Sequence, residues 1–178
     1  FLSCGIALYL GDVVKDPQGL FYSSPEMLRQ RGVEVRMRHE VISVDMAAQT
    51  LQVRNLETGD IFSDTYDKLI ITTGSWPIIP RFENGGLGNI VLSKNYNQAK
   101  ALFDKIGNAK KAVIVGAGYI GVELAEAFRT RGLEVTLIDQ EERILAKYLD
   151  PSFTNIAEKT MADHGIRLAL GETVTRFN

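Results

Sequence analysis

The chain has 178 residues, of which 45 % are hydrophobic and 24 % are charged, a composition that excludes disorder, collagen and coiled coil. The length allows one ordinary domain or two small ones. A formal net charge of −2 provides no basic field for a nucleic acid, and no run approaches the roughly 18 apolar residues of a membrane helix, so neither partner is expected.

The first half of the chain alternates between short helical and strand-like patterns. Ser3 is a candidate N-cap for a helix from Cys4 to Val14, and Ser24-Pro25 starts a second helix that ends near Gly32. Polar and apolar residues alternate as in strands at 33–35, 41–44, 51–53 and 61–62, with a hairpin turn at 57–60. The apolar run 69–71 predicts a short buried strand that leads into Thr72-Thr73-Gly74-Ser75.

The second half has the rhythm of an α/β protein. A glycine-rich connector at 83–88 places a domain boundary between about Pro80 and Ser93, which divides the chain into residues 1–85 and 86–178. The patterns that follow are a helix at 97–106, a strand at 112–115, a helix that ends near 132, a strand at 135–139, a helix from Asp150-Pro151 to about 163, and a strand at 166–170. This β-α-β-α-β order predicts an α/β fold with a doubly wound parallel sheet.

Both ends of the chain look cut. The sequence starts at Phe1 without a methionine, in what reads as the start of a helix. It stops at Asn178 inside an alternating, strand-like run. The sequence therefore predicts a piece of a longer protein, and we expect this piece alone to be inactive.

The strongest motif is the glycine-rich run Gly116-Ala117-Gly118-Tyr119-Ile120-Gly121, which leaves an apolar strand and opens a helix. Gly116 permits a tight turn, Gly118 lets the backbone approach a pyrophosphate, and Gly121 lets the helix pack close to the sheet. The N–H groups at a helix N-terminus attract phosphates. This context favours a dinucleotide site over a glycine turn that binds no ligand.

Asp139 ends the strand that follows this helix, where a carboxylate accepts hydrogen bonds from the ribose hydroxyls of adenosine. A 2′-phosphate would meet that carboxylate and the neighbouring Glu141 and Glu142, and like charges disfavour binding. Arg143 is the nearby cation that argues for NADP(H). The pattern favours NAD(H).

Cys4 is the single cysteine of the chain, so the chain forms no internal disulfide and has no cysteine-only metal site. The two histidines have no metal-ligand spacing, and we expect no metal. This cysteine usage fits a reducing cytoplasm. A thiol in a first helical turn is favoured as the thiolate, although a lone cysteine is more often a buried structural residue.

Three segments resemble the NADH oxidase and NADH peroxidase branch of the flavin disulfide reductases. The segment 1–10, Phe-Leu-Ser-Cys-Gly-Ile-Ala-Leu-Tyr-Leu, is similar to the redox-cysteine segment of that branch. Residues 66–75 look like its second flavin-domain motif, and residues 116–126 resemble its NADH-binding motif. The resemblance implies that residues 1–85 are part of an FAD-binding domain without its N-terminal FAD motif, and that residues 86–178 are part of a Rossmann-type NAD(H)-binding domain.

The resemblance also implies roles for individual residues. Cys4 would be the redox centre, which cycles between thiolate and sulfenic acid beside the flavin. Residues at the FAD site would be Val41 by its backbone, Thr72, Thr73, Gly74, Ser75 and Lys94. Tyr119 and Ile120 would lie on the nicotinamide path, and Tyr148 near the adenosine. From the residues alone, Tyr148 could equally be an ordinary half-exposed aromatic and Lys94 a solvated surface lysine.

The function that the resemblance implies is a cytoplasmic FAD-dependent NADH oxidase that reduces O₂ to water through the redox-active Cys4. An NADH peroxidase that reduces H₂O₂ is the alternative, and Ser93-Lys94-Asn95-Tyr96-Asn97 looks more like the oxidases. A non-catalytic NAD(H)-binding, redox-sensing module is the alternative from another class. The expected partners are NADH with O₂ or H₂O₂, and the resemblance implies a homo-oligomer formed through a C-terminal domain outside this chain.

Overall fold

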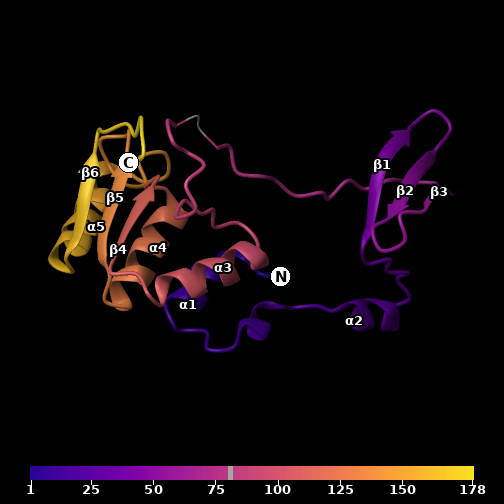
Figure 1. Cartoon of the computed structure of the whole chain (residues 1–178), viewed down its shortest axis with the longest axis horizontal. Helices are drawn as coiled ribbons and strands as arrows, with labels where there is room; N and C mark the ends of the chain where they lie inside the picture. Colours follow the sequence, from indigo (N-terminus) through magenta and orange to yellow (C-terminus); the bar gives the residue numbers. More distant parts are fainter. Residues whose placement is uncertain (80–81) are drawn as a thin grey trace. The chain divides into compact units, whose positions relative to one another are not determined.

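The computed structural model describes residues 1–79 and 82–178, and its internal contacts divide the chain into two units (Figure 1). One unit contains Phe1–Tyr22 and Trp76–Asn178, and the other contains Ser23–Ser75. Pro80, at which the predicted boundary region starts, lies outside the described residues. The assignment of residues 1–85 to a flavin-binding domain stays a prediction, because packing within the chain does not show which ligand a segment binds.

The unit Ser23–Ser75 is a short helix followed by an antiparallel three-stranded sheet in the order β1-β2-β3. Its elements are α2 (Pro25–Gln30), β1 (His39–Asp45), β2 (Thr50–Asn55) and β3 (Ile61–Thr65). Ser24 Oγ accepts a hydrogen bond of 3.2 Å from Met27 N, so the predicted cap is confirmed. The predicted hairpin turn is confirmed as well, since Asn55 N donates to Asp60 O across it at 2.9 Å.

Two predicted strands in this unit are wrong. Residues 33–35 bond to the end of α2 instead of to a sheet, because Val33 N donates to Leu28 O and Arg29 Nη2 donates to Val35 O. Residues 69–71 form no strand, and Ile70 is 83 % exposed. A buried strand needs at least one partner strand and cover on its faces, and no described strand pairs with this run.

The larger unit is built around a parallel sheet in the order β4-β5-β6. Its elements are the 3₁₀ turns η1 (Ser3–Gly5) and η2 (Pro17–Leu20), the helices α1 (Ile6–Leu10), α3 (Tyr96–Ile106), α4 (Tyr119–Thr130) and α5 (Pro151–Asp163), and the strands β4 (Lys111–Val115), β5 (Glu134–Asp139) and β6 (Ile166–Leu170). The helix α4 connects β4 to β5 and α5 connects β5 to β6, which confirms the predicted β-α-β-α-β order and the α/β fold class. None of the helices in the described part of the chain is long and apolar enough to cross a membrane.

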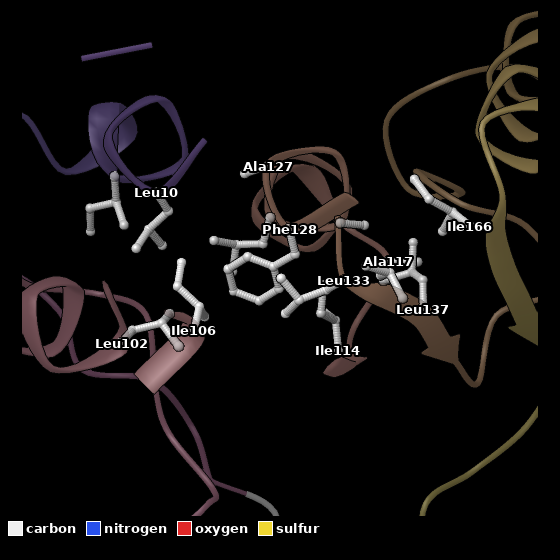
Figure 2. Close-up of a cluster of buried hydrophobic side chains, with 14 of the residues drawn as sticks. Leu10, Leu102, Ile106, Ile114, Ala117, Ala127, Phe128, Leu133, Leu137 and Ile166 are labelled. Atoms are coloured by element: carbon white, nitrogen blue, oxygen red, sulfur yellow. The ribbon is translucent and has the colours of Figure 1, made fainter. Parts of the chain in front are cut away.

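The core of this unit lies between α4 and its neighbours on both sides (Figure 2). Leu10 of α1 and Leu137 of β5 are fully buried. In Figure 2, Phe128 of α4 lies between Leu10 and Ile106 on one side and Leu137 on the other. Tyr9 stacks on Phe103 with ring centroids 4.7 Å apart, and burial is the largest cause that raises the pKa of Tyr9. Full burial of a leucine contributes about 1.5–3 kcal/mol, so these contacts hold α1 on the helix that carries the glycine turn.

The N-terminal helix is shorter than predicted, and Ser3 does not cap it. The N-cap of α1 is Gly5, without a side-chain hydrogen bond, and Cys4 lies in the 3₁₀ turn before the helix. The helix ends at Leu10 because Asp12 adopts a left-handed conformation, with φ +66°, while Val13 N bonds back to Leu8 O. Cys4 therefore has no place in the first turn of an α-helix, and the argument from a helix dipole does not apply to it.

Candidate dinucleotide and redox-cysteine site

The glycine turn between β4 and α4 has the geometry that the sequence predicts. Gly116 has φ +108°, a conformation that side chains with a Cβ rarely adopt, and its N–H continues the sheet by donating to Ile138 O at 2.8 Å. A Cβ on Gly121 would collide with the carbonyl oxygen of Gly116. Gly118 is the N-cap of α4, and a Cβ there would meet Tyr148 Cε2 at an ordinary 3.8 Å. The backbone conformation therefore requires the first glycine and close packing requires the third, whereas a side chain at the second would meet only an ordinary contact at the helix N-terminus.

Asp139 lies at the end of β5 and bonds to the glycine turn. Its Oδ2 accepts from Ala117 N at 2.5 Å, and its Oδ1 accepts from Glu141 N at 2.9 Å. A carboxylate has about four acceptor positions, so ribose hydroxyls can bind the same group. The sequence predicted the position of this carboxylate but did not predict its bond to the turn.

The segment 140–149, which follows β5, covers the glycine turn. Leu145 N donates to Ala117 O at 2.8 Å, and Leu145 adopts the left-handed φ of +53°. The ring of Tyr148 lies 4.4 Å from the ring of Tyr119, centroid to centroid, with an angle of 41° between their planes. Both tyrosines are about half exposed. The two aromatic residues of the predicted nicotinamide and adenosine positions therefore meet above the helix N-terminus.

A cavity of about 180 Å³ lies between the N-terminal turn and α4. Four of the predicted site residues line it together, namely Cys4, Lys94, Tyr119 and Ile120. The Cys4 residue is exposed. The structure thus brings the thiol of Cys4, the ammonium of Lys94 and the first turn of α4 to one cavity. From the sequence, only the family resemblance indicates that these groups lie together.

Two further residues line this cavity that sequence reasoning missed. Glu123 lies one turn after Tyr119 on α4, and the i, i+4 spacing could have placed it on the same face. Ser93 Oγ is buried, and no described residue bonds to it. A buried hydroxyl without a partner costs free energy unless a ligand or water satisfies it, so this atom is suited to hydrogen-bond a bound cofactor.

The other predicted flavin-site residues belong to the unit Ser23–Ser75, which the structure describes by itself. Val41 lies on β1 opposite Val53, next to a β-bulge, and is 52 % exposed. The run Thr72-Thr73-Gly74-Ser75 has no regular secondary structure and is exposed, and Gly74 has φ +75°. The role of these residues at FAD stays a prediction.

The fold and the glycine turn define the class of protein. A parallel sheet whose first strand leads into a glycine-rich turn and a helix N-terminus, with an acidic residue at the end of the second strand, is a Rossmann-type dinucleotide-binding unit. The sequence profile of the family described as "Pyridine nucleotide-disulphide oxidoreductase" matches residues 4–178. The chain belongs to the pyridine nucleotide-disulphide oxidoreductase family, which confirms the resemblance seen in the sequence.

Within this family, the chain is similar to several NADH oxidases. An NADH oxidase of Enterococcus faecalis is 51 % identical over 177 residues, which are 99 % of this chain and 40 % of that protein. A water-forming NADH oxidase of Lactobacillus brevis bound to NADH is 49 % identical, with a TM-score of 0.95 over 100 % of this chain and 40 % of that one. An engineered water-forming NADPH oxidase, a mutant of the latter bound to NADPH, is 48 % identical, with the same TM-score and coverage. The chain therefore spans about 40 % of the length of the relatives that it matches.

Proposed function

We propose that the protein to which this chain belongs is an FAD-dependent NADH oxidase that reduces O₂ to water. The observation that carries the proposal is the cavity that collects Cys4, Lys94, Tyr119 and Ile120 beside the helix opened by the glycine turn. The similarity to NADH oxidases, one of them water-forming, supports the same reading.

The residues of the cavity fit a flavin. The unpartnered Ser93 Oγ supplies a buried polar atom, and Lys94 supplies a cation beside the exposed thiol. Lys94 is the residue of this cavity that would hold FAD, and Val41 and the run 72–75 stay predicted FAD contacts. When bound, FAD supplies a hydride acceptor for NADH and passes electrons to oxygen.

The chain's own residues then have distinct tasks. The glycine turn and the N-terminus of α4 bind the pyrophosphate of NADH, and Asp139 accepts hydrogen bonds from its ribose. Tyr119 and Ile120 lie where the nicotinamide enters the cavity. The Cys4 thiolate attacks a peroxide oxygen, takes it up as sulfenic acid and releases water, and hydride equivalents from a second NADH return the sulfenic acid to thiolate with release of a second water. In sum, two NADH, two protons and one O₂ give two NAD⁺ and two water molecules.

The substrate preference follows from charge at the end of β5. The carboxylate of Asp139 would face a 2′-phosphate, and Arg143 Nη1 bonds instead to Asn155 Oδ1 on α5. The Glu141 carboxylate adds negative charge in the same segment, where it pairs with Lys147 at 3.4 Å. The proposed dinucleotide is therefore NADH.

Gas and peroxide measurements on the full-length protein test this proposal. We expect a yellow flavoprotein that consumes two NADH per O₂ and releases little H₂O₂. NADH oxidation that requires added H₂O₂ and consumes no O₂ would show a peroxidase. A colourless protein that binds NADH without oxidising it would show a non-catalytic module.

A further inference from the structure

The residue Glu158 on α5 lies outside the cavity, yet it is linked to the glycine turn through the segment 140–149. Its Oε1 accepts a hydrogen bond of 3.1 Å from Ile144 N. Leu145, the next residue, donates its own N–H to Ala117 O at 2.8 Å. The bond is partly buried, and the Ile144 side chain is fully buried. A two-step path of hydrogen bonds therefore connects α5 with the middle of the glycine turn.

The path passes through a strained backbone position. Leu145 has φ +53°, which costs a residue with a Cβ of the order of 1 kcal/mol. Such a conformation persists when its surroundings fix it. Here the Leu145 side chain is 8 % exposed, and its neighbour Ile144 is held by both burial and the bond to Glu158. Glu158 thus contributes to holding Leu145 in the conformation that directs its N–H toward the turn.

The bond to Ala117 O has a consequence for the amide of Gly118. In a trans peptide the carbonyl and the following N–H point in opposite directions. Because Ala117 O faces Leu145 N, the Gly118 N–H points away from Leu145, at the N-terminus of α4. The other side of Ala117 is fixed as well, since its N–H donates to Asp139 Oδ2. Both peptide groups of the turn are therefore oriented before any ligand binds.

We infer that Glu158 is a positioning residue for NADH, which acts through Ile144 and Leu145 to orient the Gly118 N–H toward the pyrophosphate. This inference rests on the proposed NADH site at the glycine turn. A donor that is oriented in advance saves the ordering cost of binding, so Glu158 affects affinity for the dinucleotide and leaves hydride transfer unchanged once NADH is bound.

Variants of the full-length holoprotein separate these effects. Glu158→Leu has no acceptor for Ile144 N, whereas Glu158→Gln keeps a side-chain oxygen at the same reach. The matched control is Asp163→Ala, which removes an exposed ion pair with Lys159 on the same helix. With ADP-ribose as the probe, titration calorimetry should show about five-fold weaker binding for Glu158→Leu, the effect of losing one hydrogen bond, and less than about two-fold change for the other two. The kcat at saturating NADH and the flavin spectrum should not change.

Other outcomes of these measurements contradict either the role of Glu158 or the proposed NADH site on which it rests. Equal affinities of wild type and Glu158→Leu contradict the role of Glu158, and so does an equal loss in Glu158→Gln or a fall in kcat with unchanged affinity. A wild-type protein that does not bind ADP-ribose contradicts the proposed NADH site itself. If Glu158→Leu fails to fold, hydrogen exchange on the wild type decides. The amides of Ile144 and Leu145 should exchange slowly without ligand, and exchange as fast as in an open loop contradicts the path.

Discussion

The proposed reduction of peroxide to water depends on the exposed residue Cys4. Serine is close to cysteine in size but forms no stable sulfenic acid, so Cys4→Ser should keep the fold, the flavin and NADH oxidation. Without a thiolate to reduce peroxide, the oxidase should release H₂O₂ in near-stoichiometric amount with the NADH consumed. A peroxide assay on the full-length protein measures this ratio.

The contrary outcomes for Cys4→Ser are equally clear. Water-forming stoichiometry in the variant would exclude the redox role. A purely structural cysteine would instead show unchanged products, with any effect of the substitution confined to stability.

Asp139 bonds to the glycine turn, and it is also the proposed ribose ligand. Asp139→Ala with Glu141→Arg removes the carboxylate that disfavours a 2′-phosphate and adds a cation. The preference for NADH over NADPH should shift by ten-fold or more, which is about 1.4 kcal/mol. Steady-state kcat/KM with both dinucleotides measures the shift.

The matched control is Asp139→Asn, which keeps a side-chain oxygen that can accept from Ala117 N. It should retain the turn and shift the preference less than the double variant. An unchanged ratio of the two kcat/KM values in the double variant would remove Asp139 from the ribose site.

At the scale of elements, the turn and α4 together form the proposed phosphate site. Gly118→Val places a branched side chain where the structure leaves open space, at φ −75°, which valine adopts without strain. We expect NADH binding to fail while the flavin and the fold persist. Gly88→Val is the control, because a Cβ at Gly88 meets no atom within 4 Å and the residue lies in the loop before α3, outside the glycine turn. NADH kinetics of Gly118→Val equal to wild type would show that the site is assigned wrongly.

Elements whose pattern follows from local periodicity could be predicted from the sequence. The stripe Ile120, Leu124, Phe128 gave α4, and the continuous apolar runs gave β4 to β6. The strand expected at 69–71 could not be judged this way, because a strand depends on its partners and not on its own residues. The helix expected to Val14 ends at Leu10, because the stop signal in Gly11-Asp12 outweighs the apolar run that continues to Val14.

Only those residues of the candidate site that belong to a sequence motif could be predicted. The glycine turn and Asp139 follow from their spacing along β4, α4 and β5. The bond from Asp139 to Ala117 N and the path through Glu158 depend on how segment 140–149 folds over the turn. Such contacts join residues far apart in the sequence, and no short-range pattern encodes them.

At the scale of the whole molecule, the apolar segment 69–79 is exposed along most of its length. Ile70 is 83 % exposed and Ile78 is 94 % exposed, and large apolar surfaces mark interaction or aggregation sites. The 178-residue chain alone should therefore bind more of a hydrophobic dye than the full-length protein does. Ile70→Ser with Ile78→Ser should lower the dye signal of the chain.

The control for that prediction is Met46→Ser, at a residue that is 72 % exposed but lies outside the segment. It should change the dye signal less than the double variant does. Equal dye binding by the chain and the full-length protein would contradict the prediction.

The way in which strands pair within each of the two sheets has a consequence for the order of folding. The strands β1, β2 and β3 are neighbours in sequence joined by short turns, so their pairing closes small loops. Each parallel pair among β4, β5 and β6 must close a loop that contains a whole helix, and the entropy of loop closure slows such contacts. Pulse-labelled hydrogen exchange during refolding should therefore protect the amide of Val53 before that of Leu137. The dinucleotide site would then be among the last parts of the chain to form, after the antiparallel strands are already in place.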